Sequence, residues 1–211
     1  MRMSNFAGRA WAAAFFLAAA LPAGCTTGPT TDVPRKYRPY GTLAILPLVQ
    51  RDLPFRALDP RNRHGAAIAE LARGALAEEL AREGTTLLDP RALQQRLQSR
   101  DTEGEPLADL AKAAGCDWPV IGTIDQFSLR DPRAVNMFRG RANLRVTVFE
   151  AKTGRAIPHT LEARFPQEDF GGYQTPGLEM EEEGVRDRLI AACARQLAWL
   201  FLDHEERRTW R

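Results

Sequence analysis

The stretch TLAILPLV at residues 42–49 constrains the fold of this chain more than any other feature, because it is almost uninterruptedly apolar. A strand with apolar side chains on both sides has to be covered on both faces, which is typical of parallel sheets flanked by helices. A second short strand is predicted over 85–88, and the stretch therefore indicates an α/β fold. Between the two strands, the inward stripe of a helix is expected to consist of Ile68, Leu71, Ala72, Ala75, Leu76 and Leu80.

Helices and strands continue to alternate through the middle of the chain. The helix-start signal DP at 89–90 precedes a short helix in which Leu93 and Leu97 are expected to face inward. A further helix is predicted over 106–114 and a third strand over 118–128. This order of elements is the one that builds a sheet with helices on its faces.

The last third of the chain has a different pattern, that of two antiparallel strands followed by a long helix. Apolar and polar residues alternate over 141–148, as in a half-buried antiparallel strand. A tight turn at 151–154 leads back into a strand over 157–165, which Pro158 assigns to an edge of the sheet. A long amphipathic helix is predicted over 178–203, with the stripe Val185, Leu189, Cys193, Leu197 and Leu200. We therefore expect an α/β (α+β) fold in which helices flank a mixed sheet of about five strands.

The N-terminal segment has the pattern of a secretion signal. A short basic start precedes the apolar run 10–21, which is well short of the ~20 residues that span a bilayer. The run ends in Leu21-Pro22-Ala23-Gly24-Cys25, which resembles the lipobox of bacterial lipoproteins, although that motif has an aliphatic residue where Pro22 stands. The resemblance implies that Cys25 is acylated and begins the mature chain. The alternative is an ordinary cleavage site next to an unrelated cysteine.

The signal divides the chain into four predicted parts. Residues 1–24 are the signal peptide, 25–40 a flexible tether rich in Thr and Pro, 41–205 a single domain and 206–211 a tail. Basic residues of the tether, Arg35, Lys36 and Arg38, are expected either near lipid phosphates or in a solvated linker. By resemblance to Gram-negative sorting rules, Thr26 after the cysteine implies the periplasmic face of the outer membrane rather than the inner membrane.

Charge gives no reason to expect a nucleic-acid partner. The chain has 29 basic and 27 acidic residues, and Arg2 and Arg9 of the signal account for the difference. A domain without net charge lacks the basic excess that nucleic-acid-binding proteins use. With 44% hydrophobic and 27% charged residues, the composition is that of a globular protein.

Catalytic and metal-binding motifs are not assembled in this sequence. The KTG at 152–154 has no accompanying SxxK, and the His-Glu pair at 204–205 lacks the second histidine of a zinc protease. Asp125 is interpreted as a strand-end acid that caps or binds backbone, with a lone carboxylate in a cleft as the alternative. We expect no enzyme activity, metal or cofactor, and rank an unrecognised hydrolase lower. Cys116 and Cys193 are either small buried hydrophobes, which we prefer, or a disulfide that the envelope permits.

Four segments occur in a fixed order along the chain: TLAILPL in the first strand, then TTLLDP, AAGCDWPVIGTI and VTVFEAKTGRAI. Together they resemble the envelope modules of the CsgG, LpoB, PelC and TolB amino-terminal kind, and the resemblance covers 42–203. Cys116 and Trp118 stand where Ala and Tyr are commoner. The resemblance implies a non-enzymatic envelope protein that binds other proteins, either as an accessory or regulatory factor or in a homo-oligomer.

Two segments are candidates for the binding surface, 129–140 and 166–177. They are short and charged or Gly-rich, which disfavours the barrel hairpins of a secretion pore. We expect partner binding by the residue types that interfaces favour, and the alternative is that these side chains cover the sheet edge. Their aromatic residues also fit a polysaccharide- or small-ligand-binding module, which is the alternative function. The candidates are Met137, Phe138, Phe170 and Tyr173.

Overall fold

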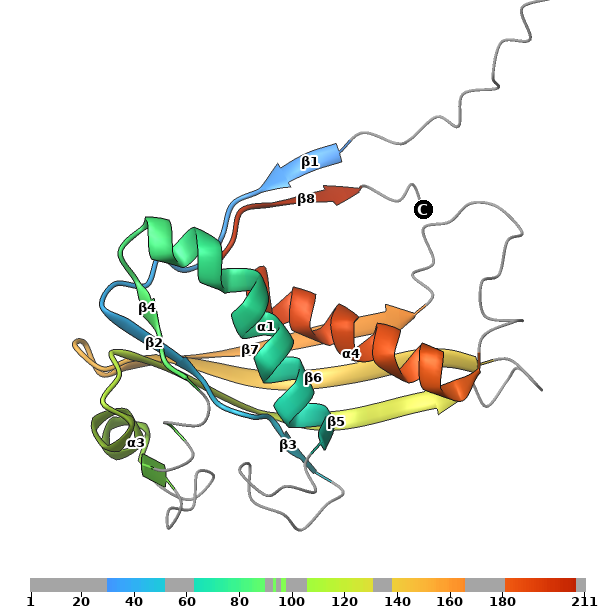
Figure 1. The fold of residues 1–211 in the computed structure, drawn as a ribbon, viewed down its shortest axis with the longest axis horizontal. Helices are drawn as coiled ribbons and strands as arrows, with labels where there is room; N and C mark the ends of the chain where they lie inside the picture. The colour runs from blue at the N-terminus through green and yellow to red at the C-terminus, as the bar shows by residue number, and fades with distance from the viewer. Residues whose placement is uncertain are drawn as a thin grey trace, which may run out of the picture.

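A computed structural model describes the chain over residues 30–51, 63–89, 93, 96–97, 106–130, 138–165 and 181–207. It contains a mixed six-stranded sheet with helices on both faces, which confirms the predicted fold class (Figure 1). The strand order is β4-β2-β5-β6-β7, and β3 also pairs with β5. The sheet strands are β2 (Thr42–Ile45), β3 (Val49–Gln50), β4 (Thr86–Leu87), β5 (Trp118–Arg130), β6 (Phe138–Glu150) and β7 (Arg155–Phe165).

The apolar stretch at 42–49 forms two strands instead of one. Both β2 and β3 run parallel to β5 and pair with it, and β2 also pairs with β4. Pro47 lies between them, and because proline has no N–H it interrupts the ladder. Leu46 still donates its backbone N–H to the carbonyl of Val120 at 3.0 Å, so the chain stays beside β5 through the interruption.

The antiparallel half of the sheet follows the predicted hairpin. β6 and β7 pair without a register shift from Glu150↔Arg155 to Gly140↔Phe165. Gly154 in the turn has φ 71°, a left-handed conformation that glycine adopts without strain. Among the described strands, β7 pairs with β6 alone, so Pro158 lies on an edge strand as expected.

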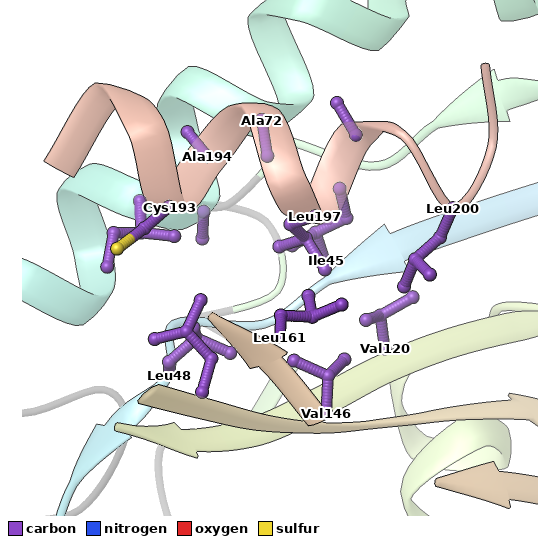
Figure 2. Close-up of a cluster of buried hydrophobic side chains, with 14 of the residues drawn as sticks. Ile45, Leu48, Ala72, Val120, Val146, Leu161, Cys193, Ala194, Leu197 and Leu200 are labelled. Carbon is purple, nitrogen blue, oxygen red and sulfur yellow. The ribbon is translucent and has the colours of Figure 1, made fainter. Parts of the chain in front are cut away.

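Helices α1 (Arg63–Arg82) and α4 (Glu182–Ala198) cover one face of the sheet, while α3 (Leu107–Ala114) packs on the other. Figure 1 shows α1 and α4 side by side over the central strands. In Figure 2, Leu197 points from α4 toward the sheet, beside Ile45 of β2 and Ala72 of α1. The side chains of β2 alternate between the two layers, because Leu43 and Ile45 belong to the large cluster and Ala44 to the smaller one under α3.

Two expectations about the helices need correction. Leu71 is 49% exposed and Ala75 is also exposed, so neither lies in the inward stripe of α1. The stripe follows Ile68 and its i+4 successors, and at 100° per residue Leu71 falls on the outer side. The last helix ends at Ala198, so Leu200 is buried from the turn that follows it, and the predicted start at 178 lies outside the described residues.

The structure differs from the expected tether from residue 30 onward. Thr30–Val33 form β1, which pairs antiparallel with β8 (His204–Arg207). Lys36 and Tyr37 both donate backbone N–H groups to the carbonyl of Leu200, at 3.0 and 2.9 Å. These residues are therefore attached to the domain, and the first two residues of the predicted tail, 206 and 207, belong to β8.

Replacing Leu197 with Ala is expected to lower the free energy of unfolding by about 2–5 kcal/mol, because Leu197 is fully buried between α4 and the sheet. The matched control is Leu71→Ala, which removes the same atoms from an exposed site on α1 and should change stability by less than about 0.5 kcal/mol. Chemical denaturation of both variants measures the difference. Equal effects at the two sites would contradict the packing described here.

Candidate partner-binding surface

The open face of the antiparallel strands carries a row of charged and polar side chains. Along β6, Ala142, Leu144 and Val146 are buried in the core, so the intervening Arg141 and Arg145 lie on the opposite side. The register places residues of β5 and β7 beside them on that side. We call this surface the arginine face and define it as Arg51, Asp125, Arg141, Arg145, Glu162 and Arg164.

Asp125 is the centre of one charged cluster on the arginine face. Arg145 donates to its Oδ2 from Nη2 at 2.6 Å and from Nε at 3.0 Å. The Thr123 hydroxyl donates to Oδ1 at 2.9 Å, and the Nε of Arg51 lies 3.6 Å from the same oxygen. Burial acts to raise the pKa of Asp125, but the bonds from Arg145 and Thr123 and the charge of Arg51 outweigh it and lower the pKa.

Both interpretations of Asp125 from the sequence are wrong. It lies within β5, at a register shift between Ile124 and Gln126, and not at a strand end. Its partners are the side chains of Arg145, Thr123 and Arg51, so it neither takes the backbone-capping role nor stands alone in a cleft. A β-bulge of this kind changes the direction in which a side chain points, and no local sequence pattern predicts where a bulge occurs.

Glu162 is the centre of a second cluster on the same face. Arg164 donates to its Oε1 from Nε at 3.0 Å and from Nη2 at 2.9 Å. Arg141 of the neighbouring strand approaches the same oxygen to 2.8 Å. The hydrogen bond from Arg164 is the main reason that the pKa of Glu162 is lowered, and the charge of Arg141 adds to it.

The electrostatics of the arginine face favour recognition of negative charge. Four guanidinium groups surround two carboxylates, and both carboxylates have lowered pKa values that keep them ionised at neutral pH. The side chains of the four arginines are between 43% and 58% exposed. Planar guanidinium groups pair well with carboxylates and phosphates, and arginine is enriched at protein interfaces.

The predicted binding residues fall largely outside the described part of the chain. Met137, Phe170 and Tyr173 are not among the described residues, and neither is the side chain of Phe138, whose backbone begins β6. The strand ends that lead into both predicted segments do lie together, since Arg130 pairs with Phe138 and Gly140 with Phe165. Cys25 also lies outside the described residues.

A separate aromatic cluster, outside the arginine face, joins Tyr37 to the edge strand β7. The hydroxyl oxygen of Tyr37 lies 2.5 Å from Nε2 of His159, and the Tyr37 ring packs against Trp118 and Phe201. Burial raises the pKa of Tyr37 and lowers that of His159. The sequence predicted residue 37 to be part of a tether and gave no sign of this contact, because the partner residue, His159, lies far along the chain. The cluster fastens residues 35–40 to the domain.

The two cysteines of the domain are free and buried, as we preferred, and the disulfide alternative is wrong. Cys116 belongs to the cluster under α3 and Cys193 to the cluster under α4, so the sheet separates them. Burial raises the pKa of each thiol to about 12, which keeps both thiols protonated.

Within the described ranges, no three His, Cys, Asp or Glu residues gather as metal ligands. No helix in those ranges is long and apolar enough to cross a bilayer.

Comparison with known proteins gives likenesses of fold only. No family model matches the chain, and no curated protein does. Lipoprotein GNA1162 from Neisseria meningitidis is 12% identical, with a TM-score of 0.44 over 76% of this chain and 99% of that one. A PelC dodecamer from Paraburkholderia phytofirmans is 12% identical, with a TM-score of 0.41 over 83% and 100%. Hypothetical protein CT253 from Chlamydia trachomatis is 17% identical, with a TM-score of 0.41 over 76% and 96%.

Proposed function

We propose that this chain is a lipid-anchored protein of the bacterial cell envelope that binds a protein partner through the arginine face and has no catalytic role. The observation that carries the proposal is the arrangement of four half-exposed arginines around two ionised carboxylates on an open sheet face. The antiparallel half of the sheet is rigid, because its other side is packed against α4. A rigid surface with fixed charges is preorganised for recognition.

The charged state of the arginine face suits binding better than proton transfer. A general acid or base works best when its pKa lies near the operating pH. The pKa values of Asp125 and Glu162 are instead lowered, so both carboxylates stay ionised. Their role is to hold the guanidinium groups of Arg145, Arg141 and Arg164 in place. The expected partner is a protein that presents carboxylates, and a second copy of this chain is one such partner.

The anchor part of the proposal depends on the sequence before the described residues. The lipobox-like run ending at Cys25 supports acylation there, and Thr26 after it supports the outer membrane. A single acyl chain binds a membrane only marginally, whereas the several chains of a bacterial lipoprotein hold it stably. Binding of a polysaccharide or small ligand stays a prediction that depends on Phe138, Phe170 and Tyr173.

Photo-crosslinking in intact membranes tests this function. A photoreactive amino acid at Thr160, which pairs with Arg145 and is exposed on the same face, should yield a crosslink to one defined protein or to a second copy of the chain. The control position is Ala77, which is exposed on α1 on the other side of the sheet. Crosslinks that are equally frequent and diverse from both positions would count against a specific partner at the arginine face.

A further inference from the structure

Four basic side chains gather at the end of the domain where β6 turns into β7. They are Lys36, Arg38, Lys152 and Arg155, and all four are exposed. The arginines of the arginine face are held by carboxylates. In the part of the chain that the structure describes, none of these four makes an ion pair or a side-chain hydrogen bond. We call the four residues together with Tyr40, which is 41% exposed, the basic patch.

The basic patch joins the chain that enters β2 to the turn between β6 and β7. Nζ of Lys152 lies 5.6 Å from the centroid of the Tyr40 ring, and the hydroxyl of Tyr40 donates to Oε1 of Glu150 at 2.9 Å. Arg155 is the register partner of Glu150 across the turn. Figure 1 shows the segment before β2 and this turn at the same end of the domain. Two segments far apart in the sequence therefore form one surface.

Lys36 lies beside the same pair of residues as Arg155. Burial lowers the pKa of His159, and the charge of Lys36 adds to this effect. Burial raises the pKa of Tyr37, and the charge of Arg155 opposes this effect. Since Tyr37 and His159 are bonded to each other, both basic residues act on one small cluster. The two charges are therefore close neighbours.

The segment before β2 is held to the domain, so its charges have fixed positions. The hydroxyl of Thr85 donates to the carbonyl of Pro39 at 2.6 Å, and the backbone N–H of Lys36 is bonded to the turn after α4. Exposed residues alternate with half-buried or buried ones from 36 to 40. Lys36, Arg38 and Tyr40 are the exposed ones and therefore share the outer side.

Arg35 is not part of the basic patch, although the sequence placed it with Lys36 and Arg38. Its side chain is 9% exposed, and its guanidinium lies 2.6 Å from each carboxylate oxygen of Glu83. The structure thus separates one basic residue that fastens the segment from two that face outward.

Two acids lie near the basic patch, and both are engaged within the domain. Glu150 accepts from the hydroxyls of Tyr40 and Thr153, at 2.9 and 2.7 Å. Asp117, whose charge acts on Tyr40, accepts from the backbone N–H of Thr42 at 2.9 Å and from its hydroxyl at 3.0 Å. Four positive charges therefore outnumber two negative ones, and the surface attracts anions.

The side chains of the basic patch suit a lipid surface better than a protein partner. Lysine is depleted at protein interfaces, yet two of the three lysines of the chain, Lys36 and Lys152, lie here. An ammonium group on a flexible stem acts as a point charge and needs no planar, bidentate partner. Each basic residue near an anionic bilayer strengthens binding about fivefold, and tyrosine is enriched at the level of the headgroups.

We infer that the basic patch docks on anionic phospholipid headgroups and holds this end of the domain against the bilayer. The inference rests on the proposed function in one respect, because the acyl anchor supplies the attachment that the patch orients. An anchor alone leaves the domain free to rotate, whereas a second contact fixes its orientation. Arg141 and Arg145 lie further along β6 from the turn, so a domain docked by this end leaves the arginine face open to a protein partner.

A fluorescent probe beside the basic patch tests the contact in the full lipidated protein. Cys116 and Cys193 are buried, so a thiol-reactive fluorophore can be attached selectively to Ala151→Cys in the exposed turn or to Ala77→Cys on α1. The vesicles contain phosphatidylglycerol, phosphatidylcholine and a lipid with a nitroxide on its headgroup. Quenching of the probe at residue 151 should be at least twice that at residue 77. Equal quenching at the two positions would overturn the inference.

Removal of two of the four charges tests the role of anionic headgroups. Lys36→Gln with Arg155→Gln should lower the ratio of docked to undocked protein about 25-fold and reduce quenching at residue 151 at least twofold. The matched control is Lys112→Gln with Arg188→Gln, which removes the same charges from exposed positions of α3 and α4 and should leave quenching unchanged. Vesicles without phosphatidylglycerol should also reduce quenching at least twofold. Undiminished quenching in either test, or equal loss in both double variants, would contradict docking by the basic patch.

Flotation of the same vesicles separates failure of this inference from failure of the proposed function. Wild-type protein that does not float lacks the anchor, which overturns both. Protein that floats without preferential quenching at residue 151 overturns only the inference. A photoreactive amino acid at residue 151 that crosslinks to a protein, in place of quenching, would assign the basic patch to a protein partner and likewise overturn the lipid contact.

Discussion

Charge reversal of Arg141 and Arg145 together, Arg141→Glu with Arg145→Glu, is expected to weaken partner binding at least tenfold. The two side chains lie on the open side of β6 with Asn143 between them, and each belongs to a different cluster of the arginine face. The change replaces attraction to the partner's carboxylates by repulsion, which costs several kcal/mol in a docked interface. The measurement is the yield of the Thr160 photo-crosslink, followed by the dissociation constant once the partner is purified.

The matched control for this double variant lies on α1. Arg73→Glu with Arg82→Glu changes the net charge by the same amount and breaks the ion pairs of the partly exposed Arg73 with Glu70 and of the exposed Arg82 with Glu79. Exposed pairs of this kind contribute about 0–1 kcal/mol each, so both double variants should remain folded. Equal loss of binding in both would mean that net charge, and not the arginine face, determines binding.

Cys25→Ala is expected to move the protein almost completely from the membrane fraction to the soluble fraction and to abolish fatty-acid labelling. The physical reason is that the acyl chains supply the stable part of membrane binding, while a few basic and aromatic residues bind only weakly and reversibly. Fractionation and labelling with a clickable palmitate measure both effects. Cys116→Ser is the control, because Cys116 is buried in the domain and its loss should leave labelling unchanged. A Cys25→Ala protein that stays labelled and membrane-bound would contradict the anchor.

Local sequence patterns were sufficient to predict how the helices and strands of this fold are layered. The alternation at 141–148 predicted both the strand β6 and which of its side chains face away from the core. The same alternation already contained Arg141 and Arg145, yet it could not show what surrounds them. Glu162 comes to Arg141 through the pairing of β6 with β7, and Asp125 comes to Arg145 through a bulge in β5. Register and bulges depend on the whole sheet, so the site emerges only when the strands are paired.

The N-terminal stretch is a second case in which local sequence patterns could not predict long-range contacts. Residues 25–40 are rich in Thr and Pro and have no apolar period, so every local rule describes a linker. The partner of Thr30 is Arg207, and the partner of Tyr37 is His159. Pairings between the two ends of a chain leave no trace in a local window, because neither segment needs an unusual composition to make them. Such contacts therefore have to be found in three dimensions.

The most direct test of the central claim is a charge-swap cycle between this protein and the partner found by crosslinking. Arg145→Glu is combined with an acidic-to-arginine substitution at the crosslinked site of the partner, and binding is measured for the four combinations. If the arginine face binds carboxylates of the partner, each single substitution weakens binding at least tenfold and the pair together restores most of the loss. Additive losses, with no recovery in the double variant, would contradict the proposed role of the arginine face.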